Sequence, residues 1–400
     1  MGELSSLERE AVERAVAEPM LQHVLAWSAI NSGSRNLDGL KTIAGVLADE
    51  LATLPGELSL RDPARVEAVD AAGKSIELPH GQNLHLSVRS NAPVQLLFTG
   101  HMDTVFAVDH AFQETRWLDD ATLNGPGVAD MKGGIAVMLA ALKAVEASGA
   151  DVGFEIVINS DEEVGSLGSA PLIAEAARGK RAALTYEPSA LPDGTLAGAR
   201  PGSGNFAITI HGRSAHAGRN PEDGRNALLA ASDLALRFEA MRKAGLSVNP
   251  ARIDGGSPTN VVPDLAVLRV NLRPRTTELE TEAQALIDQA IAAVASERDV
   301  RIEISGGFAR PPKPMTPDME ALFALVKRAG ADLGQSIGWQ PSGGVCDGNN
   351  IAACGVPVVD TMGVRGGKIH SMEEFLIVES LKERAALSAL TILRLAGGGR

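Results

Sequence analysis

The apolar positions along the chain change from a helical to a strand spacing and back several times. Two helical patterns come first, at residues 7–30 and 37–54. Short apolar runs of strand length follow, and helical stretches lie between them. This alternation predicts an α/β sheet with helices on both of its faces. The predicted strands are residues 84–90, 94–100, 154–160, 182–188 and 356–361, and the later helices are residues 135–148, 171–179 and 380–397.

A different order of elements interrupts this pattern between residues 199 and 308. The apolar spacing there predicts strand, helix, strand, strand, helix and strand, with the last strand at residues 301–305. That order is the signature of a ferredoxin-like split β-α-β module. We therefore predict a discontinuous domain, residues 1–198 and 309–400, and an inserted domain, residues 199–308. The segment FARPPKP that follows the last strand is expected to act as a hinge.

Composition narrows the classes of function. Hydrophobic residues make up 44% of the 400 residues and charged residues 22%, as in ordinary globular proteins. The formal net charge of −13 excludes nucleic acid and anionic membranes as expected partners, because both require a basic surface. The first residues are acidic where a signal peptide would be basic, so we expect no signal peptide. No apolar run is long enough for a membrane span, so we expect none. Only two cysteines occur, so we expect a reducing compartment and a cytoplasmic location.

Acidic and imidazole side chains stand at the ends of the predicted apolar strands. His101 and Asp103 follow one strand, and Glu187 ends another. Because ligands of open α/β sheets bind at the carboxyl ends of strands, we expect these side chains to lie close together. Asp130 and His370 lie in glycine-rich loops beside such elements. The whole set is His101, Asp103, Asp130, Glu162, Glu163, Glu187 and His370.

The residue types in this set indicate a metal site. Imidazoles and carboxylates without cysteine suit zinc or a similar divalent ion, and the number of carboxylates suits more than one ion. Because residues i and i+2 of a strand share a face, His101 could bind a metal while Asp103 holds its ring. Of the adjacent Glu162 and Glu163, one could bind metal and the other could act as a general base.

Six short motifs occur in the order found in a family of co-catalytic zinc exopeptidases and deacylases: GHMDTV, GVADMKGG, SDEEVGS, EPS, HGRSAHAG and IHSMEEF. The chain resembles this family over nearly its whole length. The family includes glutamate carboxypeptidase, aminoacylase, acetylornithine deacetylase and succinyl-diaminopimelate desuccinylase, and the glutamate carboxypeptidase branch looks closest. The resemblance implies a zinc-binding catalytic domain that is interrupted by a lid domain, through which two subunits form a homodimer.

The resemblance also implies roles for the polar set. Glu162 matches the family's general base, and Asp103 matches the aspartate that orients the first histidine. The peptide bond between Asp130 and Met131 is a candidate for the cis form. The implied ligands of two Zn²⁺ ions per subunit, which Co²⁺ or Mn²⁺ could replace, are His101, Asp130, Glu163, Glu187 and His370, with Asp130 bridging both ions.

One implied catalytic residue lies in the inserted domain. His216, in HGRSAHAG, matches the family histidine that reaches across the dimer to stabilise the oxyanion of the reaction. If this match holds, one subunit alone is an incomplete enzyme.

A substrate handle is implied as well. Asn260 and Arg273 match lid positions that bind the free carboxylate of the substrate in the carboxypeptidase branch. A guanidinium suits a carboxylate because it donates two parallel hydrogen bonds. Arg269, on the same face of its strand, is a rival for Arg273. Gly343 and Gly344 match a glycine-rich loop that lets the substrate backbone come close to the site.

These assignments predict an enzyme that hydrolyses the amide bond next to a C-terminal amino acid with a free carboxylate, using a metal-activated water. The expected partners are a small-molecule or dipeptide-like substrate and a second copy of the chain. An N-acyl-amino-acid deacylase is the alternative. The glutamate at position 187 resembles the carboxypeptidase and deacylase members of the family more than the aminopeptidases, so the resemblance disfavours an aminopeptidase or dipeptidase. A binding relative without activity is the alternative outside the enzymes, and the complete set of ligands and base argues against it.

Overall fold

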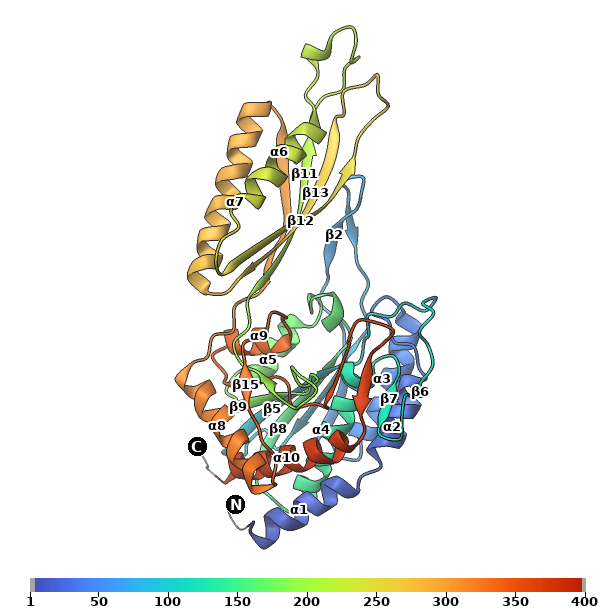
Figure 1. Ribbon diagram of the computed structural model, residues 1–400, viewed down its shortest axis with the longest axis vertical. Helices are drawn as coiled ribbons and strands as arrows, with labels where there is room; N and C mark the ends of the chain where they lie inside the picture. The colour runs from blue at the N-terminus through green and yellow to red at the C-terminus, as the bar shows by residue number, and fades with distance from the viewer. Residues whose placement is uncertain (1–3, 398–400) are drawn as a thin grey trace.

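The computed structural model describes residues 4–397, which form two lobes (Figure 1). The larger lobe is built around a mixed six-stranded sheet. The first three strands in spatial order pair antiparallel, and the third also starts a set of four strands that pair parallel. In spatial order the strands are β1 (Glu57–Arg61), β4 (Asn83–Val88), β8 (Gly153–Asn159), β5 (Gln95–His101), β9 (Ala182–Thr185) and β16 (Val358–Val359).

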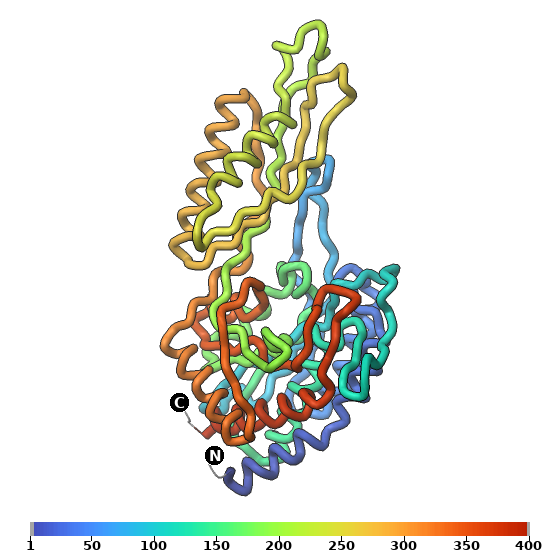
Figure 2. The backbone as a smooth tube through the Cα atoms, viewed as in Figure 1, coloured from blue at the N-terminus to red at the C-terminus, as the bar shows by residue number. Residues whose placement is uncertain are grey.

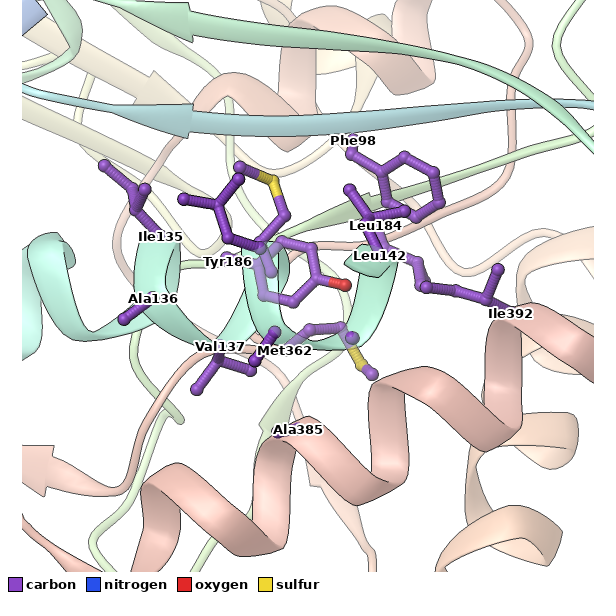
Figure 3. Packing of buried hydrophobic residues seen from close by; sticks show 14 of the residues in the cluster. Phe98, Ile135, Ala136, Val137, Leu142, Leu184, Tyr186, Met362, Ala385 and Ile392 are labelled. Atoms are coloured by element: carbon purple, nitrogen blue, oxygen red, sulfur yellow. The ribbon is translucent and has the colours of Figure 1, made fainter. Parts of the chain in front are cut away.

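Helices cover both faces of this sheet, which confirms the predicted α/β class. Phe98 of β5 belongs to the apolar cluster that contains α4 (Gly133–Ala147) and α10 (Glu379–Ala396), whereas the next strand residue back, Leu97, packs with α5 (Ala170–Ala177). Figure 3 shows side chains from the sheet, from α4 and from α10 meeting in the first cluster. The other helices of this lobe are α1 (Ser6–Ala17), α2 (Met20–Ser28), α3 (Leu37–Leu51), α8 (Pro317–Asp332) and α9 (Asp347–Ala353).

The helical pattern predicted at residues 7–30 is divided into two helices. Helix α1 ends at Ala17 and α2 begins at Met20. Pro19 lies between them, and proline has no N–H for a helical hydrogen bond and forces the preceding residue into an extended conformation. Glu18 is extended, with φ −62° and ψ 143°.

The smaller lobe, residues 203–310, has the predicted order of elements. Its four antiparallel strands lie in the order β12, β13, β11, β14. The two helices α6 and α7 cover one face of this sheet (Figure 1). The elements are β11 (Ser203–His211), α6 (Ala227–Glu239), β12 (Leu246–Gly255), β13 (Leu265–Pro274), α7 (Thr277–Arg298) and β14 (Arg301–Arg310).

Strand β14 is longer than the predicted strand at residues 301–305. Gly306 and Gly307 stay paired with β11, so the strand continues to Arg310. Residues 308–310 therefore belong to a strand and not to a hinge, which corrects that prediction.

A hairpin of the larger lobe reaches the smaller lobe. Its strands are β2 (Glu67–Val69) and β3 (Ser75–Glu77), and it rises beside the smaller lobe in Figure 2. The Val69 carbonyl accepts a hydrogen bond from Arg269 Nη2 at 2.9 Å. Arg269, the predicted rival of Arg273, is thus engaged in an interlobe contact.

Short strands complete the larger lobe, and the sequence patterns did not predict most of them. The short strands are β6 (Arg116–Trp117), β7 (Thr122–Asn124), β10 (Leu196–Ala197), β15 (Trp339–Gln340), β17 (Gly366–Gly367) and β18 (Phe375–Ile377).

None of the helices within residues 4–397 combines the length and the apolar character that crossing a membrane requires.

Candidate metal centre

Five of the predicted polar residues converge at the carboxyl end of the large sheet. Strand β5 ends in His101, a short helical turn that starts at Glu162 follows β8, and Glu187 follows β9. The ligand atoms form two groups, and within each group they all lie within 4.8 Å of one another. We call His101, Asp130 and Glu187 the inner group, and Asp130, Glu163 and His370 the outer group.

The inner group is buried. His101 Nε2 lies 3.2 Å from Oδ1 of Asp130 and 3.7 Å from Oε2 of Glu187. The other ring nitrogen, Nδ1, lies 3.0 Å from the carbonyl oxygen of Asp103 and 3.3 Å from its Oδ1. Because the Asp103 oxygens only accept, Nδ1 donates to them, and Nε2 is the nitrogen that faces Asp130 and Glu187. Metal-binding histidines use the same arrangement, with the second ring nitrogen bonded to a carboxylate or a carbonyl.

The outer group is more open to solvent. His370 Nε2 lies 3.0 Å from Oε2 of Glu163 and 3.3 Å from Oδ2 of Asp130. The His370 side chain is 53% exposed, against 1% for His101. The two carboxylate oxygens of Asp130 thus face different groups, so this residue could serve two ions.

The turn that carries Asp130 is held by backbone hydrogen bonds. The bond between Asp130 and Met131 is cis, as predicted, and lies in a π-helical turn (Val128–Lys132). Glu374, in the motif IHSMEEF, accepts hydrogen bonds from the backbone N–H groups of this turn and its entry. The donors are Gly127 at 3.1 Å and Ala129 and Asp130 at 3.0 Å each.

Two glycines allow close backbone contacts at the start of α4. A Cβ at Gly134 would lie 1.9 Å from the carbonyl oxygen of Tyr186, and one at Gly133 would lie 2.5 Å from that of Val128. Any larger residue at position 134 would push α4 away from the backbone that carries Glu187. Gly134 therefore lets the helix that follows Asp130 lie close to the segment that carries Glu187.

The charges of the site fit a cation. Burial raises the pKa of Glu163 well above its ordinary value, and the charge of Asp130 adds to the shift. Burial also raises the pKa of Glu187. Carboxylates crowded in a buried site repel one another, and a divalent cation relieves that repulsion. Imidazole and carboxylate donors without cysteine suit zinc, and cobalt or manganese as well.

Glu162 lies beside both groups without belonging to either. Burial raises its pKa to about 7, although the Arg310 guanidinium acts against the shift. Arg310 Nη2 lies 2.7 Å from Glu162 Oε1 and donates to the Glu162 carbonyl at 3.0 Å and to Ser166 Oγ at 2.7 Å. Sequence reasoning missed Arg310, because no spacing relates a residue in the returning strand β14 to one after β8.

Asp103 holds the segment that carries the two glutamates. Its carboxylate accepts from the backbone N–H of Glu162 at 3.1 Å and of Glu163 at 3.2 Å. It also accepts from the hydroxyl of Ser34 at 2.7 Å, a contact that no motif indicated. Asp103 is 0% exposed, so its charge is stabilised entirely by these contacts and by His101.

Two cavities border the groups. One, of about 1010 Å³, lies between the lobes and is lined by Glu162, His370 and Arg273. The other, of about 590 Å³, lies within the larger lobe and is lined by Glu162 and Glu187. Gly344 lines both cavities, and the carbonyl of its neighbour Gly343 accepts a hydrogen bond from Arg273 Nη1 at 3.3 Å.

The structure does not bring His216 and Asn260 to the metal ligands of the same subunit. Both are exposed, in the loop after β11 and in the loop between β12 and β13. The two loops contact each other, because the N–H of Ala217 donates to the Asn260 carbonyl at 2.9 Å. They lie at the end of the smaller lobe that points away from the larger lobe (Figure 1).

Imidazole and carboxylate side chains around a cleft, at the carboxyl ends of an α/β sheet, form an arrangement that metal-dependent hydrolases use. The chain belongs to peptidase family M20/M25/M40, whose sequence model matches residues 97–394. It is therefore a metal-dependent peptidase or amidohydrolase, as the resemblance of its motifs predicted.

Several known proteins are similar to the chain. Carboxypeptidase G2 of Pseudomonas sp. (strain RS-16) is 29% identical over 379 residues, covering 92% of this chain and 87% of the relative. Succinyl-diaminopimelate desuccinylase of Rhodopseudomonas palustris (strain HaA2) is 29% identical over 349 residues, covering 76% and 84%. The crystal structure of a tripeptidase from Staphylococcus aureus subsp. aureus Mu50 has the same fold, with a TM-score of 0.73 at 24% identity over 96% of this chain and 99% of that chain.

Proposed function

We propose that the protein hydrolyses the amide bond next to a C-terminal amino acid whose carboxylate is free. The observation that carries this proposal is the interlobe cavity, which is lined by Arg273 as well as by Glu162, Glu163 and His370. A substrate with its scissile carbonyl at the ligand groups would extend its carboxylate toward Arg273. The guanidinium there is well suited to bind it.

The proposal includes two divalent ions per subunit, with zinc as the expected metal. The residues that would hold them are those of the inner and outer groups, and Asp130 would bridge both ions. Once bound, such ions lower the pKa of a water molecule and polarise the substrate carbonyl. Asp103 would keep the His101 ring in the orientation that presents Nε2.

Glu162 is the proposed general base. A carboxylate with a pKa near 7 takes a proton readily at neutral pH and can return it. Glu162 would accept a proton from the attacking water and deliver it to the leaving nitrogen. Arg310, at 2.7 Å from Oε1 of Glu162, would fix the position of the carboxylate.

A second subunit would complete the site. His216 and Asn260 lie on adjoining exposed loops, far from the ligand groups of their own subunit. Their position supports a homodimer formed through the smaller lobe, in which His216 of one subunit stabilises the oxyanion in the other. Losing one such donor typically lowers kcat by about 10²–10³-fold.

An N-acyl-amino-acid deacylase is the second candidate, and the similarity to a desuccinylase favours it. Both reactions break the same kind of bond and release an amino acid with a free carboxylate. They differ in the acyl part, which the cavity of about 590 Å³ would receive. That cavity has apolar walls that include Pro188, Ala190 and Phe375, and Arg200 and Lys368 also line it. Both apolar and anionic acyl groups are therefore candidates. A cytoplasmic location belongs to the same proposal.

Hydrolysis of N-acyl and dipeptidyl amino acids by the zinc-loaded protein tests the proposal. Each substrate is offered with a free and with an amidated C-terminus, and Glu162→Gln is the control. We expect turnover only of the free acids and a loss of about 10²–10⁴-fold in the control. Equal turnover of the amidated substrates would contradict the role of Arg273 and favour an aminopeptidase.

A further inference from the structure

Three asparagines stand side by side on the sheet face of the smaller lobe that α6 and α7 do not cover. The strand register pairs Asn271 of β13 with Asn205 of β11 on one side and with Asn249 of β12 on the other. Their neighbours in sequence face the helices, so these three side chains point the opposite way. All three line the interlobe cavity that also contains Glu162 and His370. We call them the asparagine row.

Hydrogen bonds fix the direction in which the row points. A guanidinium can only donate, and Arg273 Nε donates to Oδ1 of Asn271 at 3.0 Å. Asn271 therefore turns its Nδ2 away from Arg273 and donates to Oδ1 of Asn205 at 2.9 Å. With its oxygen occupied, Asn205 keeps its own amide nitrogen for another acceptor. The chain of hydrogen bonds from Arg273 through Asn271 thus ends at Nδ2 of Asn205, a donor that faces the cavity.

The cavity has room for a ligand group beside Nδ2 of Asn205. Within residues 4–397, neither Nδ2 of Asn205 nor the carboxamide of Asn249 has a hydrogen-bond partner. The residue opposite Asn205 on β14 is Gly307, where a Cβ would meet nothing within 4 Å. A ligand group could therefore enter next to Asn205. An oxygen acceptor would satisfy the amide, whereas an aliphatic group would remove water from it and leave it unpaired.

We propose that the asparagine row recognises the side chain of the released amino acid and favours one that ends in a carbonyl oxygen, as a carboxylate or a carboxamide. The inference rests on the proposed function, in which Arg273 binds the main-chain carboxylate of the same amino acid. Because Arg273 is hydrogen-bonded to Asn271, the two recognition elements adjoin. The side chain of this amino acid is attached to the carbon next to that carboxylate, so it would contact the asparagine row.

A substrate series with one acyl group tests this specificity. The N-benzoyl derivatives of glutamate, glutamine and methionine have side chains of similar length, but methionine has no carbonyl oxygen. We expect kcat/KM of the better of glutamate and glutamine to exceed that of methionine by about tenfold or more. The better one identifies the acceptor as a carboxylate or a carboxamide. In Asn205→Leu and in Asn249→Leu the ratio should fall toward one.

The matched control is Asn91→Leu, at an exposed turn of the larger lobe outside the interlobe cavity, which should keep the ratio of the wild type. Because each ratio is taken within one variant, a loss of folded protein lowers both rates equally and cancels. Turnover of all three substrates at similar rates by the wild type would overturn the role of the row and leave the proposed function intact. A high ratio that survives in both row variants would also overturn it. Turnover of none of the three would overturn the proposed function, and the role of the row with it.

Discussion

The inner and outer groups share Asp130 but differ in their surroundings. The inner group closes around His101, which is 1% exposed, whereas the outer group depends on His370, which is 53% exposed. Buried ligands are held by packing and by further hydrogen bonds, so they keep their geometry when no ion is bound. A solvent-exposed ligand can rotate away. We infer that the inner group is the preformed half of the site and that the outer group exchanges its ion more readily.

Replacing the shared ligand should abolish this difference and have the largest effect. Asp130→Asn removes the charge that serves both groups, so we expect neither ion to be retained through gel filtration. Metal-ion catalysis supplies several kcal/mol, so kcat/KM should fall by about 10³-fold or more. Metal analysis of the purified variant, together with the rate, checks this. Retention of two ions per subunit would contradict the bridging role.

Limited chelation should separate the two groups. Metal analysis after stepwise dialysis against a chelator should show one ion leaving first and a second that stays much longer. In His370→Ala, the zinc-loaded protein should hold about one ion from the start, and that ion should leave with the slow phase of the wild type. Loss of both ions in one phase would show that the groups are equivalent.

Weakening the support of the inner group should have a smaller effect. Asp103→Asn keeps the size of the side chain but removes the charge beside His101 Nδ1, which lies 3.3 Å from Oδ1. Changes at such supporting residues typically lower metal affinity by about 10–100-fold. A competition titration with a metal-binding dye measures the change. We expect the tightly bound ion to be affected, and an effect confined to the weak ion would contradict the assignment.

The smallest effect is expected one contact further out. Ser34→Ala removes one hydrogen bond to Asp103, at 2.7 Å, but leaves the carboxylate in place. A single hydrogen bond contributes about 1 kcal/mol net, so the affinity for the tight ion should fall by less than about tenfold. The same titration measures it, with Ser90→Ala at an exposed turn as the control. A loss as large as that of Asp103→Asn would mean that Ser34 supports more than this carboxylate.

Much of the fold followed from local patterns. Apolar runs located β5, β8 and β9, and strand ends located the polar set, because side chains at the carboxyl ends of neighbouring strands meet. The helical spacing at residues 7–30 did not show where α1 ends and α2 begins, because Pro19 interrupts an otherwise continuous pattern. Short strands such as β17 and β18 were missed because two or three residues carry no periodicity.

The contacts between distant segments could not be predicted in the same way. Arg310 meets Glu162 only because β14 returns to the larger lobe at that point. The asparagine row depends on the register of three strands, which no alternation within one strand reveals. Sequence motifs identified residues by type and order, whereas these residues matter through the position of one element against another.

The order of the ligands along the chain has a consequence for protein synthesis. The three residues of the inner group all precede the smaller lobe, and His370 follows it. The apolar cluster of the smaller lobe is closed within residues 206–308, so we expect that lobe to fold on the ribosome while the larger lobe still lacks β16 and α10. His370, the last of the proposed metal ligands, then arrives with the last part of the sheet and its covering helix. A ribosome that stops early therefore releases a chain that cannot assemble the outer group.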